Sequence, residues 1–162
     1  MAAVLCPRET SSTTVATFVD TNILVYAEDR DAGSKHTIAR DLVGDLWRSE
    51  QGVLSVQVLQ EFFVTVTRKM PRPLAPGGAL AIVEQYLTWR VVENTGDLLL
   101  AAIRSASDLR VSFWDALILE AARMARCDRL WTEDLNHGRR IGELLIVNPF
   151  LPHSPPAGGA GG

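Results

Sequence analysis

The most informative part of the sequence lies near its start, at Val15-Ala16-Thr17-Phe18-Val19-Asp20-Thr21-Asn22. Its apolar first half is typical of a buried strand, and Asp20 follows that strand directly. A second apolar run, Ile23-Leu24-Val25-Tyr26-Ala27, comes straight after it. Open α/β sheets bind their ligands at the carboxyl ends of their strands. The stretch therefore predicts a buried strand that delivers a carboxylate to that edge.

The rest of the chain alternates between strand and helix patterns. Strands are predicted at 15–19, 53–55, 90–93, 129–132 and 144–147. The helices predicted between them are one capped by Ser34, one over 56–69, one through Leu80, Val83 and Leu87, one capped by Thr95 and one opened by Asp115. Strands separated by helices indicate right-handed crossovers and a mostly parallel sheet covered on both faces. We therefore expect an α/β fold, a three-layer α/β/α sandwich.

Two of these helices have apolar residues spaced so as to face a core. For the helix over 56–69 the inward residues are predicted to be Leu59, Phe62, Phe63 and Val66. For the helix that follows Thr95 they are predicted to be Leu98, Leu99, Ala102, Ile103 and Ala106.

The bulk composition is that of one globular domain. The chain has 162 residues, of which 47% are hydrophobic and 22% charged. We place the domain at 15–150, between a flexible leader (1–14) and a flexible tail rich in proline and glycine (151–162). Cys6 and Cys127 have no metal-type spacing, and no basic residue precedes the short apolar start. We therefore expect a cytoplasmic protein without membrane contact.

Charge argues neither for nor against a nucleic-acid substrate. The formal net charge is −3, so no global field attracts RNA or DNA, although local patches can still do so. Basic residues that follow two of the predicted elements are candidate phosphate contacts: Arg68, Lys69, Arg72, Arg139 and Arg140. The commoner explanation for such residues is a solvated basic end of a helix.

Four acids occupy the places where a parallel α/β chain would gather them: Asp20, Glu61, Asp115 and Asp134. Several carboxylates in one pocket repel each other and stay ionised together only if a cation joins them. Each acid also has a local explanation. Asp20 and Asp115 can cap helices, Glu61 can be an exposed ion-pairing residue, and Asp134 can belong to a turn.

At these residues the chain resembles PIN-domain nucleases. The resemblance lies in four motifs, in order and at matching intervals: Phe18-Val19-Asp20-Thr21-Asn22, Leu59-Gln60-Glu61-Phe62, Phe113-Trp114-Asp115-Ala116 and Leu130-Trp131-Thr132-Glu133-Asp134. It covers roughly residues 17 to 150. The short single-domain length is similar to VapC-type toxins of toxin–antitoxin pairs. The motif frame selects Asp134 over its neighbour Glu133.

The resemblance implies a PIN-like fold and a ribonuclease that depends on Mg²⁺ or Mn²⁺. It implies that the four acids are catalytic and hold the metal, with Asn22 and Thr132 as supporting polar groups. It also implies a homodimer held silent by a small VapB-like antitoxin.

Two alternatives belong to other functional classes. A haloacid-dehalogenase-like phosphatase also has an aspartate after its first strand, but it needs a second acid where Asn22 stands and a later lysine than Lys35 or Lys69. A PIN fold can instead bind RNA or a protein without cleavage. Metal-dependent RNA cleavage separates an RNA-cleaving enzyme from both.

Overall fold

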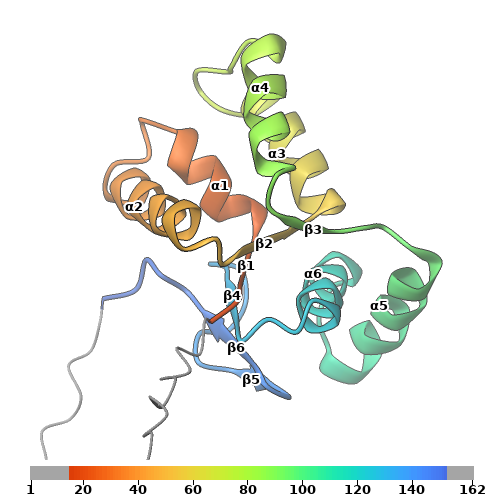
Figure 1. Ribbon diagram of the computed structural model, residues 1–162. Coiled ribbons are helices and arrows are strands. Elements are labelled where there is room, and N and C mark those ends of the chain that lie inside the picture. Colours follow the sequence, from red (N-terminus) through yellow and green to blue (C-terminus); the bar gives the residue numbers. More distant parts are fainter. Residues whose placement is uncertain (1–14, 153–162) are drawn as a thin grey trace, which may run out of the picture.

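A six-stranded sheet lies at the centre of residues 15–152, the part of the chain that this computed structural model describes (Figure 1). The strands are β1 (Thr17–Val19), β2 (Gly52–Ser55), β3 (Arg90–Val92), β4 (Arg129–Trp131), β5 (Arg140–Ile141) and β6 (Leu144–Val147). Their order is β3-β2-β1-β4-β6-β5, and all neighbours are parallel except β5 and β6. The leader expected at 1–14 and nearly all of the tail expected at 151–162 lie outside the described residues.

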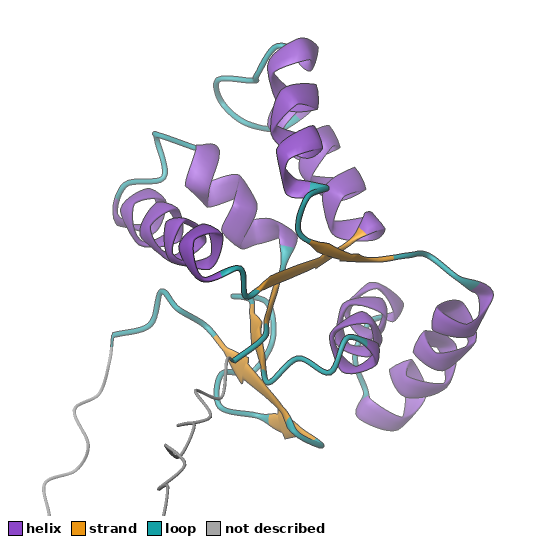
Figure 2. Cartoon of the chain, viewed as in Figure 1, coloured by secondary structure: helices purple, strands orange, loops and turns teal. Residues whose placement is uncertain are grey.

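Helices cover both faces of this sheet (Figure 2). They are α1 (Thr21–Glu28), α2 (Ser34–Ser49), α3 (Val56–Arg68), α4 (Pro76–Tyr86), α5 (Gly96–Leu109) and α6 (Phe113–Met124). The α5 and α6 helices pack against each other on one face, and α1 to α4 group on the other (Figure 1). The predicted three-layer α/β/α sandwich with a mostly parallel sheet is therefore confirmed.

The centre of the sheet is continuously apolar because both of its faces are covered. Phe18, Leu54, Leu130 and Ile146, from the four central strands, are fully buried. Cys127 is also buried and free, and this burial raises the pKa of its thiol to about 12. The buried side chains of the described residues thus form one hydrophobic core, in which helices pack against both faces of the sheet. Among the described residues no helix is long and apolar enough to span a membrane.

Two helix starts differ from the sequence-based expectations, and a third agrees with them. The α2 helix begins at Ser34, but its N-cap is Gly33, whose φ of 61° suits glycine, and no side chain caps it. Asp115 is the third residue of α6 rather than the first, because Ser112 caps that helix. Thr95, in contrast, caps α5 as predicted, its hydroxyl accepting from the amide of Leu98 at 3.2 Å.

Fewer residues of α3 and α5 are buried than the sequence pattern predicted. Phe63 is exposed, whereas Leu59, Phe62 and Val66 are buried. On α5, only Leu98 and Ala102 are buried, and Leu99 and Ile103 are 45% and 52% exposed. Leu99 and Ile103 stay exposed because α5 packs mainly on α6 rather than on the sheet.

The two-residue strand β5 was not predicted from the sequence.

A close contact between glycine and tryptophan fixes the start of β2. Trp89 belongs to an aromatic cluster, with ring centroids 5.0 Å from Trp47 and 5.4 Å from Tyr86. A Cβ atom added to Gly52 would lie only 2.1 Å from the Trp89 ring. The ring therefore occupies the space that any side chain at position 52 would need.

We predict that Gly52→Ala lowers the free energy of unfolding by about 1–3 kcal/mol, because it overpacks this buried contact. The matched control is Gly44→Ala in α2, where the added Cβ meets only the end of the Arg48 side chain. That change is expected to be neutral or to stabilise by up to about 1 kcal/mol. Urea denaturation of both variants measures the difference, and equal stabilities would contradict the packing argument.

Candidate active site

The carboxyl end of β1 places Asp20 at the edge of the sheet, where it also caps α1. Its Oδ1 accepts from the backbone amide of Thr21 at 2.6 Å, and its Oδ2 accepts from the Thr132 hydroxyl at 2.7 Å. Thr132 directly follows β4, which pairs with β1 in the register Phe18 to Leu130 and Val19 to Trp131. Strand pairing therefore brings two residues 112 positions apart into one hydrogen bond.

Asn22 joins Asp20 to Asp134. Its amide nitrogen donates to Asp134 Oδ2 at 2.9 Å and to Asp20 Oδ2 at 3.3 Å. The backbone amide of Asp134 in turn donates to the Thr132 hydroxyl at 3.1 Å. Asn22 and Thr132, the two predicted supporting residues, thus lie between the first and last of the four acids.

Glu61 reaches the same edge from α3, which begins where β2 ends. Its Oε2 accepts from the Thr21 hydroxyl at 3.2 Å, and its Oε1 accepts from the Gln57 amide at 2.8 Å. Thr21 is the residue that also donates its backbone amide to Asp20. Neighbouring polar groups therefore link Glu61 to Asp20. The local alternative for Glu61, an exposed ion pair, finds no partner among the described residues.

Asp115 lies at the same edge but apart from the other three acids. The α6 helix runs back towards the start of β4, so its N-terminus lies on the side where the parallel strands end. There Asp115 and Ser112 bond reciprocally, hydroxyl to carboxylate at 2.7 Å and amide to hydroxyl at 3.0 Å. Its neighbour Trp114 lines the same cleft as Glu61. The structure thus brings three acids into one hydrogen-bonded group and leaves the fourth, Asp115, in a separate hydrogen-bonded pair with the N-cap Ser112.

Burial and like charge both act on Asp20. The pKa of this carboxyl is raised from 3.8 to about 6, chiefly by burial and also by the charges of Asp134 and Glu61, against the lowering effect of the hydrogen bonds from Thr132 and Thr21. The proton is therefore held more tightly in the folded chain than in the unfolded one. Such a carboxylate gains from a cation that replaces the proton.

The donor set at this edge fits Mg²⁺ or Mn²⁺, which prefer oxygen ligands. It consists of carboxylates with one amide, and the Asn22 Oδ1 atom is buried without a hydrogen-bond partner among the described residues. Within residues 15–152 no group of three or more acidic, His or Cys side chains is placed so that it could hold a metal ion as a protein cage by itself. Mg²⁺ does not need such a cage, because it usually keeps several waters and takes one or two carboxylates.

The five predicted phosphate contacts have different surroundings. Lys69 caps the end of α3 and lines the cleft that contains Glu61. Arg72 instead forms an exposed ion pair with Asp31, and Arg139 donates to the carbonyl of Leu109 at 3.2 Å. Arg68 and Arg140 are exposed, at the end of α3 and on β5. Lys69 is thus the basic residue of this set that shares a cleft with one of the acids.

Sequence reasoning missed three residues that orient the acids: Thr21, Gln57 and Ser112. Gln57 precedes Glu61 by four positions, one helical turn, which was a usable signal. The bond from Thr21 to Glu61 spans 40 residues and has no local signal. Glu133, the neighbour that could be confused with Asp134, pairs with Lys35 and Tyr26 outside the hydrogen-bonded group.

A separate cavity of about 380 Å³ lies between α1, α2 and α4, beside Trp47 and Tyr86. None of the four acids lines it. It is therefore distinct from the candidate active site.

Comparison with known proteins places this geometry in a family. A family model described as PIN domain matches residues 17–142. Solved structures with a similar fold include VapC20 of Mycobacterium tuberculosis, described as a sarcin–ricin loop cleaving toxin. It is 26% identical, with a TM-score of 0.55 over 71% of this chain and 87% of that one. Among curated proteins no match is found.

Two further structures are more distant in sequence. A toxin–antitoxin complex from Klebsiella pneumoniae has a TM-score of 0.61 and 18% identity, over 83% of this chain and 98% of that one. VapBC2 from Rickettsia felis, bound to a DNA fragment from its promoter, has a TM-score of 0.56 and 18% identity, over 81% and 96%. At such identities the likeness concerns the fold alone.

The raised pKa of Asp20 predicts a pH dependence of stability in metal-free protein. Because the folded state binds this proton more tightly, the contribution of Asp20 to stability falls as pH rises from about 4 to about 6. Asp20→Asn removes the titration. Relative to wild type in EDTA, the variant should therefore gain up to about 3 kcal/mol between pH 4 and pH 7. Denaturant unfolding at several pH values measures this, and a difference that does not change with pH would contradict the assignment.

Proposed function

Because the chain belongs to the PIN domain family, we propose that it is a metal-dependent endoribonuclease and the toxin of a toxin–antitoxin pair. The observation that carries the proposal is the hydrogen-bonded group in which Thr132, Asn22 and Thr21 join three carboxylates at the sheet edge. Nothing in the stability of a fold calls for three acids linked in one hydrogen-bonded group, since their charges repel each other. A site for a cation and an anionic substrate accounts for them.

In this mechanism Asp20 and Asp134 would hold Mg²⁺ or Mn²⁺, and Glu61 and Asp115 would do so directly or through water. The bound ion would lower the pKa of a water molecule and neutralise charge on the phosphate. The chain's own groups hold the acids ready. The Thr132 hydroxyl and the Thr21 amide orient Asp20, Asn22 fixes Asp134, and Gln57 orients Glu61.

Hydrolysis adds water across one phosphodiester bond of RNA. A water oxygen attacks phosphorus, and the bond from phosphorus to the leaving ribose oxygen breaks. The water proton needs an acceptor, and a carboxylate at this edge can accept it. Lys69, at the end of the cleft beside Glu61, is positioned to attract the phosphate chain.

We predict that Asp20→Asn and Asp115→Asn abolish metal-dependent RNA cleavage and leave the fold intact. Groups that only orient a metal ligand typically contribute 10- to 100-fold, so loss of an acid should cost more than about 100-fold. The matched control is Asp108→Asn, an exposed acid on α5 that is none of the four site acids. The assay uses end-labelled RNA with Mg²⁺ or Mn²⁺, and a sarcin–ricin loop RNA belongs in the panel because VapC20 is described as cleaving that loop.

Three controls give this test its meaning. EDTA should stop cleavage, and added metal should raise the melting temperature of metal-free protein, since ligands that bind the native state stabilise it. A small phosphomonoester should not be hydrolysed. Its hydrolysis would favour a phosphatase instead. Near wild-type cleavage by either purified acid variant would overturn the assignment. No cleavage together with no metal-induced stabilisation would favour a binding module.

We also predict a small partner protein that silences the enzyme and a homodimer of the chain. A partner's arginine can neutralise the carboxylate edge through a bidentate ion pair. Co-expression with the neighbouring reading frame should give a co-purifying complex and reverse growth arrest, and light scattering of the free chain should give twice the chain mass. If the neighbour does not bind and the chain expressed alone is harmless, the toxin role fails while the nuclease role stands.

A further inference from the structure

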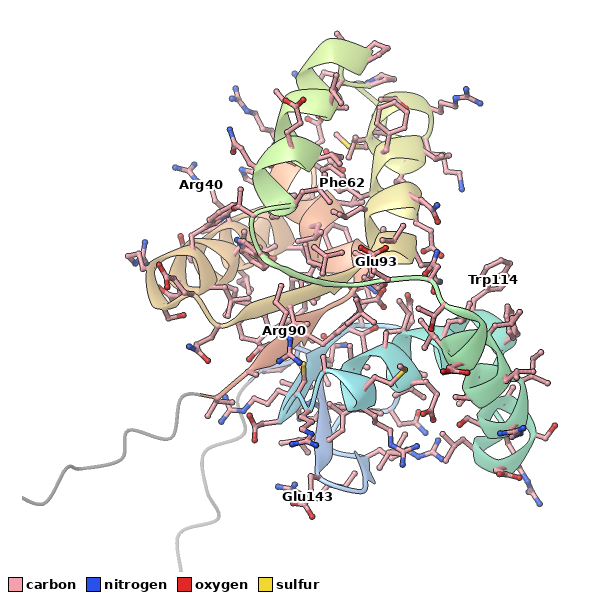
Figure 3. All side chains as sticks on the ribbon, turned by 45° about the vertical axis from the view of Figure 1, so that its right-hand side comes forward. Arg40, Phe62, Arg90, Glu93, Trp114 and Glu143 are labelled. Carbon is pink, nitrogen blue, oxygen red and sulfur yellow. The ribbon has the colours of Figure 1, made fainter. Side chains whose placement is uncertain are left out.

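Trp114 is the most exposed large hydrophobic side chain in the described part of the molecule, at 62%. It is the second residue of α6, and its ring packs edge-on against Phe113, with centroids 5.3 Å apart. It projects from the start of α6, on the side of the molecule that carries α3 (Figure 3). An indole left in water at this place contributes little to the core, so its position calls for an explanation other than folding.

The Trp114 ring lines two clefts that share one wall. The first, about 600 Å³, also contains Glu61 and Lys69. The second, about 350 Å³, runs along α5 past Asn94. Gln57 and Gln60 line both clefts, as Trp114 does. The tryptophan therefore stands between a cleft at the acids and a cleft that leads away from them.

The chemistry of these walls matches a nucleotide. Single-stranded RNA is bound by aromatic rings on which bases stack, with amide groups at the base edges and cations along the phosphates. Trp114, the amides of Gln57 and Gln60, and the ammonium of Lys69 supply these three kinds of group in one place. Trp114 also directly precedes Asp115, and Gln57 donates to Glu61. A base stacked here would therefore be a near neighbour of the scissile phosphate.

A third cleft differs in chemistry from the one that Trp114 shares with Glu61, and the comparison favours RNA over a protein as the ligand at Trp114. It is about 300 Å³ in volume, lies between α3 and α4, and is lined almost entirely by apolar side chains, including Leu59, Phe63, Leu80 and Leu87. A hydrophobic groove of that kind suits an apolar helix of a protein partner. The 600 Å³ cleft at Trp114 instead combines the indole with two amides, Glu61 and Lys69, and this mixture suits a base and its phosphates better.

We propose that Trp114 is the stacking platform for an RNA base flanking the cleavage site, with Gln57 and Gln60 at the base edge and Lys69 on the adjoining phosphate. The inference rests on the proposed nuclease function and adds to it the residue that positions the substrate. Stacking is tolerant of base identity, because every base has a flat face. Trp114 therefore contributes to affinity and fixes the position of the RNA strand relative to the acids, while base preference must come from the groups around it.

The test compares RNA with and without bases. Asp20→Asn protein, which does not cleave, is titrated with a labelled single-stranded RNA of about ten nucleotides and with an equally long chain of stable abasic ribose analogues. In that background, Trp114→Ala should weaken binding of the base-bearing RNA roughly 5- to 150-fold and binding of the abasic chain less than about twofold. Trp114→Phe, which can still stack, should retain most of the affinity.

Two further variants distinguish the loss of base stacking from the loss of a charge and from the loss of exposed apolar surface. Lys69→Ala should weaken both ligands alike and reduce the salt dependence of binding, because it removes a phosphate contact rather than a base contact. Leu100→Ala, an exposed apolar residue of α5 that lines neither cleft, should change neither affinity. In wild-type protein, Trp114→Ala should raise KM for RNA cleavage more than it lowers kcat.

The outcomes separate this inference from the function on which it rests. If wild type cleaves RNA but Trp114→Ala binds both ligands as its parent does, the stacking role is overturned and the nuclease survives. Equal affinity of unaltered Trp114 protein for base-bearing and abasic chains overturns it as well, whether or not the alanine variant folds. A loss confined to dimer formation or partner binding would make Trp114 a protein contact. If no RNA is bound or cleaved, both ideas fall together.

Discussion

The hydrogen bond from the Thr132 hydroxyl to the Asp20 carboxylate is the constraint on which the candidate active site depends. It exists because β1 and β4 are neighbouring parallel strands, so the first residues beyond both strands meet at one edge. The same bond partly offsets the cost of burying Asp20. Asn22 and the Asp134 backbone amide attach to this pair, and Thr21 extends the group to Glu61. A slip of the β1–β4 register would separate these groups.

The site also shows that the fold tolerates repulsion at this edge. Asp20 is buried and its pKa is raised to about 6, although the charges of Asp134 and Glu61 oppose its ionisation. A chain selected only for stability would place an apolar or amide side chain there. The buried or half-buried acids Glu120 and Glu133, in contrast, are paired, with Arg123 and Lys35. Asp20 is thus a buried acid without a cationic partner among the described residues, at a place where a bound cation would neutralise it.

The strand-end residues of the site were predictable from the sequence because a parallel sheet converts chain position into spatial position. Asp20 and Thr132 each follow an apolar run, and Asp134 comes two residues after Thr132. The bond between Thr21 and Glu61 was not predictable, since it depends on how α3 tilts against α1. The exposure of Leu99 and Ile103 on α5 escaped prediction for a related reason. An apolar stripe indicates that a helix packs on something, but not how wide the contact is.

The surface around the acids divides into regions of different chemistry, and α3 borders both. Towards α4 this helix borders an almost wholly apolar cleft. Towards α6 it borders a cleft that contains amides, Lys69 and the exposed ring of Trp114 from α6. Residues of one helix alternate between these sides, so Gln57 and Glu61 serve the polar region while Leu59 and Phe63 serve the apolar one. Because Glu61 and the apolar cleft belong to the same helix, a protein seated in that cleft would lie within one helix diameter, about 10 Å, of the Glu61 carboxylate. Such a partner could obstruct RNA at Trp114 without touching Asp20.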